Sequence, residues 1–330
     1  MRKRILICAL LFTAVCALIG GILHLYVSRI PGELIEYQSS DKWGAEDYAH
    51  MAVYMTEDAG FDANTMLRVK TEIIDAYTID SIETASALYS ASCEETLMLA
   101  SPNSARTSSC KATVYLGDYF NFHPIELVEG AFPDRDSVLT DALVIDELAA
   151  WQIFGTQRGV VGLEIELDND IYIVSGVASV PKGVYTEVYG DTPRVYINAD
   201  SAGMRTESSE RAFTSFEAML PDPITNFAQN TLTTVFSGFS PVIVNIDNRF
   251  EGEALDDIRD KQTSLITDSS DTDYPYTEKA MIILALKASD VYAVQKVMMY
   301  LALAGVAVIF FTVFTPAVRF IEKLLSKLKF

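Results

Sequence analysis

Two long apolar stretches, one near each end of the chain, constrain its fold more than any other feature. Residues 5–27 and 297–318 contain no Asp, Glu, Lys or Arg. An α-helix rises about 1.5 Å per residue, so a stretch of this length crosses a hydrocarbon core of about 30 Å. Each stretch therefore predicts a transmembrane helix, and the residues between them must fold as a separate domain.

A cleaved signal peptide is the alternative for the first stretch. The apolar core of such a peptide is about 7–15 residues long and precedes small residues at the cleavage site. The stretch here is longer, and residues 26–29 read Tyr-Val-Ser-Arg, which is a poor cleavage site. A lipoprotein site at Cys16 is disfavoured because Val15 stands where a small residue is required. We therefore predict that the helix is retained.

The distribution of charge orients the two helices. Seven of the 25 Lys and Arg residues lie in the short tails outside the apolar stretches: Arg2, Lys3, Arg4, Arg319, Lys323, Lys327 and Lys329. Lys and Arg are retained on the cytoplasmic side, which places both termini in the cytoplasm and the middle outside. Residues 28–296 hold 18 Lys and Arg against 44 Asp and Glu, a balance of −26. Such a domain repels phosphates, so nucleic acid is excluded as a partner.

These signals divide the chain into four parts. Residues 1–29 form the N-terminal tail and the first transmembrane helix, and residues 30–295 form the extracytoplasmic domain. Residues 296–318 form the second transmembrane helix, and residues 319–330 form a basic amphipathic tail in the cytoplasm. The tail predicts an anchor on anionic lipid, with contact to a cytoplasmic partner as the alternative.

Hydrophobic periodicity predicts an α+β fold for the middle domain. We expect helices at residues 62–78, 140–154, 250–260 and 280–300. We expect strands at residues 48–56, 85–100, 111–120, 162–167, 170–180, 193–199 and 236–248. Asp62 is the expected N-cap of the first helix, and the last helix should continue into the second apolar stretch. Apolar residues between 213 and 239 are expected in the core, with an exposed partner patch as the alternative.

Strands 85–100 and 111–120 flank a polar, turn-rich stretch, which predicts a hairpin with two of the four cysteines on its arms. Outside the cytosol, an opposed pair such as Cys93 and Cys110 can oxidise. A disulfide there would close a loop of about 17 residues and contribute about 3 kcal/mol. We predict this disulfide, with two independent thiols as the alternative. Cys8 and Cys16 lie in the first apolar stretch and are expected to be small packing residues.

Residues that could carry chemistry are few and scattered. His24 lies in the first apolar stretch, and His50 and His123 each stand alone in strand-like surroundings, without the spacing of a metal site. The sequence has neither a G-x-S-x-G nucleophile motif nor a G-x-x-x-x-G-K-[ST] phosphate-binding motif. We therefore predict no catalytic residue, no metal and no cofactor, and a protein that is not an enzyme.

Two acidic groups are the remaining candidates for ion binding. The first is predicted to be a solvated helix face and consists of Glu251, Glu253, Asp256, Asp257 and Asp260. The second lies in a polar loop and consists of Asp268, Asp271 and Asp273. Weak Ca²⁺ binding is the alternative for the second group, which lacks the glycine and the ligand spacing of an EF-hand loop.

The stretch from residue 127 to residue 180 carries a recognisable pattern. It reads Leu-Val-Glu-Gly-Ala-Phe at 127–132, Ala-Leu-Val-Ile-Asp-Glu-Leu-Ala at 142–149, Phe-Gly at 154–155, Val-Gly at 161–162 and Tyr-Ile-Val-Ser-Gly-Val at 172–177. This pattern resembles the periplasmic core domain of MacB-type ABC transporter permeases, in the FtsX-like superfamily. The matching positions are Gly130, Phe132, Val144, Ala149, Phe154, Gly155, Gly162, Val174, Gly176 and Val177.

The matching positions argue for an architecture rather than for a site. Gly130 and Gly176 imply tight turns or close backbone approach, and Val144 and Phe154 imply a buried helix face. The resemblance implies a MacB-like core domain between two membrane helices. Family members have four such helices, whereas two stretches are present here.

The resemblance also implies a function. The chain would be a non-catalytic membrane subunit of an ABC-type export or mechanotransmission complex. Its extracytoplasmic domain would dock a protein partner or substrate and relay motion across the bilayer. A separate P-loop ATPase and further membrane subunits are the implied partners. A stand-alone cell-surface binding or scaffold protein, which reuses the fold without an ATPase, is the alternative.

Overall fold

The computed structural model describes most of the chain. The described residues are 2–37, 48–133, 141–180, 182–201, 204, 211–248, 250, 252, 254–256 and 276–327. They fall into two compact units, which we describe separately. One unit comprises Met1–Pro31, Phe250–Gln262 and Leu284–Phe330, and the other comprises Gly32–Arg249 and Thr263–Ile283.

The first unit contains the two predicted membrane segments as long helices. Helix α1 is Arg2–Val27, and helix α11 is Tyr276–Lys327, of which the residues from Leu284 onward belong to this unit. Among the described residues, these helices are long and apolar enough to cross a membrane, with mean hydropathies of 2.7 and 2.5. Their most apolar windows are only 11% and 6% buried, which is unlike the core helix of a soluble protein. Both apolar stretches therefore form helices that are candidate membrane spans.

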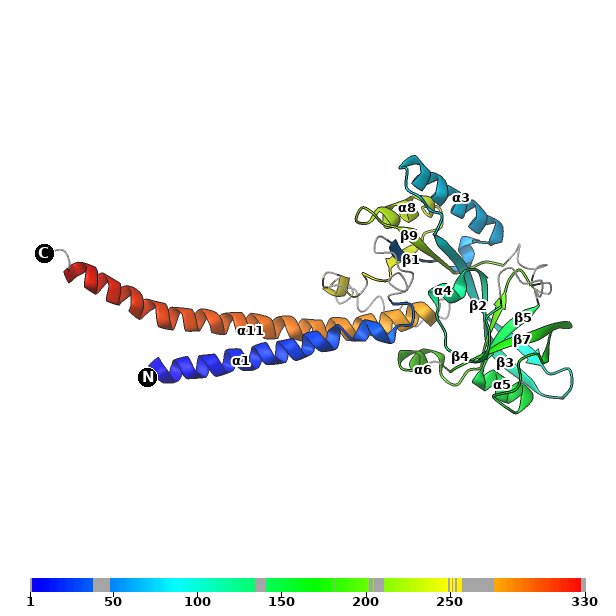
Figure 1. The fold of residues 1–330 in the computed structure, drawn as a ribbon, viewed down its shortest axis with the longest axis horizontal. Helices are drawn as coiled ribbons and strands as arrows, with labels where there is room; N and C mark the ends of the chain where they lie inside the picture. Colours follow the sequence, from blue (N-terminus) through cyan, green and yellow to red (C-terminus); the bar gives the residue numbers. More distant parts are fainter. Residues whose placement is uncertain are drawn as a thin grey trace. The chain divides into compact units, whose positions relative to one another are not determined.

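Small side chains let the two long helices approach each other within this unit (Figure 1). A Cβ atom added to Gly305 would lie 2.1 Å from the Thr13 Oγ1 atom, and one added to Gly20 would lie 3.7 Å from the Met298 Cβ atom. Membrane helices often pair through such small residues, because there is little hydrophobic driving force between helices in lipid. The prediction that the helix from residue 280 continues into the second span is also confirmed, since α11 is one helix.

The second unit is built on a mixed ten-stranded sheet (Figure 1). Its strands are β1 (Tyr48–Tyr54), β2 (Leu88–Ala100), β3 (Thr107–Gly117), β4 (Leu127–Gly130), β5 (Ala142–Asp146), β6 (Glu164–Leu167), β7 (Asp170–Ala178), β8 (Arg194–Asn198), β9 (Ser215–Pro221) and β10 (Val242–Asn245). The order is β10-β1-β9-β2-β3-β8-β5-β7-β4, and β6 pairs with both β2 and β7. The pairs β3–β8 and β5–β7 are parallel. The predicted α+β class is confirmed.

Short helices complete this unit. They are η1 (Ile30–Glu33), η2 (Glu57–Ala59), α3 (Ala63–Ile79), α4 (Tyr119–Phe122), α5 (Glu147–Phe154), α6 (Val184–Tyr189) and α8 (Phe227–Val235), with η1 at the boundary between the units. The Asp62 side chain caps α3 by accepting a hydrogen bond of 2.7 Å from the Thr65 amide, as predicted. Met66, Val69 and Ile73 then recur on the buried face of α3.

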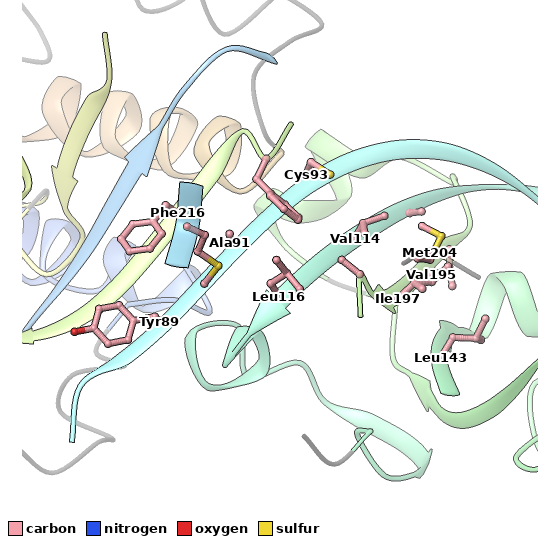
Figure 2. Packing of buried hydrophobic residues seen from close by; sticks show 14 of the residues in the cluster. Tyr89, Ala91, Cys93, Val114, Leu116, Leu143, Val195, Ile197, Met204 and Phe216 are labelled. Carbon is pink, nitrogen blue, oxygen red and sulfur yellow. The ribbon is translucent and has the colours of Figure 1, made fainter. Parts of the chain in front are cut away.

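The sheet has two differently built faces. The main core covers one face, where α3, α5 and α8 pack over alternate residues of the strands; Figure 2 shows part of it. On β9 these residues are Phe216, Ala218 and Leu220. The predicted core role of the apolar segment 213–239 is confirmed, since Phe213, Phe216 and Phe236 are fully buried.

The prediction of one helix over residues 140–154 is wrong. Residues 142–146 form β5, a central strand between β7 and β8, and α5 begins at Glu147. A strand buried on both faces is a continuous β-branched and apolar run, which periodicity alone cannot distinguish from a helix. Val144 therefore lies in a strand, not on a helix face. Helix α5 ends at Gly155 as predicted, with that residue in the left-handed conformation.

The predicted strand over residues 236–248 is mostly wrong. Phe236 follows α8 and is buried in the core, and β10 covers only Val242–Asn245. The predicted helix 250–260 lies largely outside the described residues. The acidic groups also lie outside them, apart from Asp256.

The predicted disulfide between Cys93 and Cys110 is wrong. Both cysteines are free and buried. Cys93 is paired with Val114 across the hairpin, whereas Cys110 is paired with Leu97, four positions away. At about 3.3 Å per residue this offset is about 13 Å along the strands. A disulfide requires Cα atoms within about 7 Å. Burial raises the pKa of the Cys110 thiol to about 11, which makes it unreactive.

Candidate functional site

Two histidines that the sequence places far apart lie in one buried network. The Nε2 atom of His50, on β1, is 3.1 Å from the Oε1 atom of Glu217, on β9. The Nε2 atom of His123, which follows α4, is 2.6 Å from the Oε2 atom of the same carboxylate. The fold therefore brings together His50 and His123, which stand alone in the sequence. Glu217, which no sequence motif indicated, joins them.

A second carboxylate extends this network toward the segment that follows α1. The Nδ1 atom of His123 is 2.8 Å from the Oε1 atom of Glu36. The Tyr185 hydroxyl donates a short hydrogen bond to the other oxygen of Glu36 and accepts one of 3.0 Å from the Ile35 amide. We call the side chains of His50, Glu217, His123, Glu36 and Tyr185 the buried network, because each is at most 3% exposed.

The alternation of strand residues explains where the buried network lies. On β1, Ala49 and Met51 point into the main core, so His50 between them points to the opposite face of the sheet. Glu217 lies between Phe216 and Ala218 on β9 and shares that opposite face. We call it the second face.

Aromatic rings help to shield the two histidines from water. The Phe122 ring lies 5.0 Å from the His50 ring, and the Tyr119 ring stacks on His123 at 4.3 Å. Both aromatic residues come from α4, which packs against β2. The sequence Tyr119 to His123 therefore supplies one member of the network together with part of its cover.

The network holds opposite charges in a dry environment. Burial alone would lower the pKa of His123, but the negative charge of Glu217 and the hydrogen bonds to Glu217 and Glu36 raise that pKa to about 10. Burial alone would raise the pKa of Glu217, but the charge of His123 and the hydrogen bonds from both histidines lower it to about 2. His123 and Glu217 therefore form an ion pair across the neutral pH range.

The arrangement suits a structural connection better than a metal centre. Among the described residues, no group of three or more His, Cys, Asp or Glu side chains is placed to hold a metal ion. Both oxygens of Glu36 and of Glu217 already accept hydrogen bonds from nitrogen or hydroxyl donors. The chemistry of this network is therefore to hold separate parts of the chain together.

A cavity of about 250 Å³ adjoins the buried network. Its walls include Glu36, His123, Tyr185, Tyr119 and Tyr196. Protein cores rarely leave unfilled space much larger than a water molecule. The network is thus well packed against the sheet but borders open space on the side of Glu36.

The positions that carry the family pattern lie elsewhere in this unit. Gly130 and Gly176 face each other between β4 and β7, where an added Cβ on Gly130 would lie 2.2 Å from the Ser175 carbonyl oxygen. The side chains of Val144, Ala149, Val174 and Val177 are buried, and Phe154 is partly buried against the core. Phe132 stacks on Phe120 at 4.0 Å, and Gly155 and Gly162 adopt positive φ angles of 76° and 85°.

A mixed-sheet domain whose chain continues into an apolar helix on each side defines a class of membrane-anchored domain. The chain belongs to the MacB-like periplasmic core domain family, whose profile matches residues 5–267. No curated protein matches the chain.

Solved structures are similar to part of the chain at low sequence identity. The periplasmic region of MacB from Actinobacillus actinomycetemcomitans is 16% identical, with a TM-score of 0.42, over 60% of this chain and 89% of that one. The extracellular domain of the noncanonic ABC-type transporter YknZ from Gram-positive bacteria is 12% identical, with a TM-score of 0.41, over 60% of this chain and 100% of that one.

Proposed function

We propose that this protein is a non-catalytic membrane subunit of an ABC-type export or mechanotransmission complex. Its outer domain docks a protein partner or a substrate and relays motion across the membrane. Membership of the MacB-like family and the two apolar helices support this role. The observation that carries the proposal is helix α11, a single helix of 52 residues. Its first turns belong to the sheet unit, and its later turns form the candidate span.

A continuous helix is suited to relaying motion because its backbone hydrogen bonds are internal to the segment. Displacement of one end moves the other end, whereas a flexible linker would absorb the movement. In this proposal both termini are cytoplasmic, and the domain of residues 30–295 lies outside. Spans within 1–29 and 296–318 flank that domain, and the basic tail 319–330 lies against the inner leaflet.

Affinity purification of the full-length chain from its native membrane tests the assignment. A mild detergent and mass spectrometry are used, with an unrelated two-span protein as the control bait. Stoichiometric recovery of a P-loop ATPase and a further membrane subunit is the expected result. Recovery of envelope proteins without an ATPase would overturn the proposal and favour a stand-alone scaffold.

A pair of insertions tests the relay itself. Asp290 is an exposed residue of α11. Inserting Gly-Gly after it softens the helix, whereas inserting Ala-Ala gives the same change of length and rotation in a stiff helix. Coupled ATP hydrolysis by the purified complex should fall further with Gly-Gly than with Ala-Ala. Equal rates in the two variants would contradict a relay through α11.

A further inference from the structure

The segment that follows α1 is held to the sheet by a buried carboxylate. Glu36 lies nine positions after Val27, the last residue of α1. Its two oxygens bind His123 and Tyr185, and the neighbouring Ile35 amide also donates to Tyr185. Through His123 the connection continues to Glu217 on β9, inside the sheet. A short covalent tether and a hydrogen-bonded chain thus join α1 to β9.

We propose that Glu36, His123 and Tyr185 form a latch that couples α1 to the sheet. When the latch is closed, movement of α1 is carried through Glu36 and His123 to Glu217. When it opens, residues 32–37 leave the sheet and the coupling is lost. The claim that the latch transmits motion rests on the proposed function. The claim that Glu36, His123 and Tyr185 form a latch does not.

The composition of the contact favours a latch over ordinary packing. Removing two charges from water is so unfavourable that apolar side chains of similar volume often give equal or greater stability. The best-attested use of such buried polar groups is to fix one arrangement or to switch between two. Glu36 is 3% exposed and satisfied on both oxygens, so it holds one defined position in the closed state.

The surroundings provide room for the open state. The cavity of about 250 Å³ borders Glu36, His123 and Tyr185, so the carboxylate can turn away without displacing core side chains. Gly32 begins the sheet unit, and an added Cβ there would meet no atom within 4 Å. An exposed glycine free of close contacts can act as a hinge.

Hydrogen exchange of the full-length protein in detergent tests the latch. In Glu36→Gln, the amide group replaces one acceptor oxygen with a donor. In Tyr185→Phe, the hydroxyl that binds both Glu36 and Ile35 is lost. We expect the amides of residues 32–37 to exchange at least about tenfold faster in both variants, while exchange in β9 changes by less than about twofold.

Two matched controls keep the test specific. Glu33→Gln makes the same chemical change at an exposed position of the same segment. Tyr77→Phe removes a different buried hydroxyl, which donates to the Pro221 carbonyl at 2.8 Å. Neither control should release residues 32–37. Unchanged exchange in both latch variants, or equal release in Tyr77→Phe, would overturn the latch.

The two proposals can fail separately. Faster exchange in the latch variants without recovery of an ATPase would leave the latch standing and remove the transporter role. Recovery of the ATPase with unchanged exchange in both latch variants would do the opposite. If Glu36→Gln does not fold, Tyr185→Phe alone decides the test, because it keeps the ring and the charge balance.

Discussion

The two faces of the same sheet are held together in different ways. On the core face, Phe216 packs among the rings of Phe61, Phe236 and Tyr89, so its stabilising effect is distributed over several contacts. On the second face, Glu217, one residue further along β9, is held by two defined contacts. The core face tolerates changes that preserve its volume, whereas the buried network on the second face depends on the identity of single atoms.

The largest expected effect comes from the core face. Phe216→Ala should lower the free energy of unfolding by about 3–5 kcal/mol, because it removes a fully buried ring and leaves a cavity. Chemical denaturation of the full-length protein, followed by tryptophan fluorescence, measures this loss. The control is Met98→Ala at a side chain that is 58% exposed, where the change should stay within about 0.5 kcal/mol. Equal losses in the two variants would mean that the described core is misassigned.

The second face should respond to a change that leaves volume almost untouched. Glu217→Gln should cost about 2–3 kcal/mol, because a buried charged partner of His123 is lost and a donor then faces a donor. The matched control is Glu164→Gln, the same change at an exposed position of β6, which should cost less than about 0.5 kcal/mol. The same denaturation series measures both. A cost of Glu217→Gln as small as that of the control would contradict the ion pair.

The pH dependence of stability should separate the two faces. The contribution of His123 is complete below pH 6.5 and is lost as the pH rises toward 10, because folding raises its pKa. The contribution of Glu217 is complete above pH 4.5 and is lost as the pH falls toward 2, because folding lowers its pKa. Stability from this pair should therefore be greatest between pH 4.5 and 6.5.

Urea unfolding across this pH range tests the assignment to His123. The other titratable groups of the buried network are Glu36, Glu217, His50 and Tyr185. His123→Gln should flatten the decline on the alkaline side. Phe216→Ala should lower stability by a similar amount at every pH, since no charge is involved. An alkaline decline that persists in His123→Gln would assign the pH dependence to another group.

The core face of the sheet could be predicted from the sequence far better than the second face, for a physical reason. Period-two alternation and local capping lie within a few neighbouring residues, so β1 and the Asp62 cap of α3 could be found. The buried network joins His123 to positions 87 and 94 residues away. Such contacts depend on tertiary pairing, and neither periodicity nor motif spacing encodes them. The available signal was a histidine between apolar residues of a predicted strand, as at His50. This signal does not show which residue the histidine contacts.

The wrong predictions have a related cause. Periodicity could not separate the run Ala142 to Ile145 from a helix, because a strand buried on both faces loses its alternation. For the cysteines, placement on two arms of a hairpin did not fix the register. The hairpin turns at residues 101–106, which pairs Ser101 with Arg106 and sets Cys93 opposite Val114.

The smallest expected effect follows from this register. Adding a reductant should leave the thermal stability of the protein unchanged, and both Cys93 and Cys110 should be alkylated after unfolding without reductant. The control is Val114→Cys, which sets a second thiol directly opposite Cys93 in an antiparallel pair, with Cα atoms about 4.5–5.5 Å apart. That distance lies within the range of a disulfide, so oxidation should protect two thiols in this variant. Protection of Cys93 and Cys110 in the unaltered protein would show that the hairpin pairs in a different register.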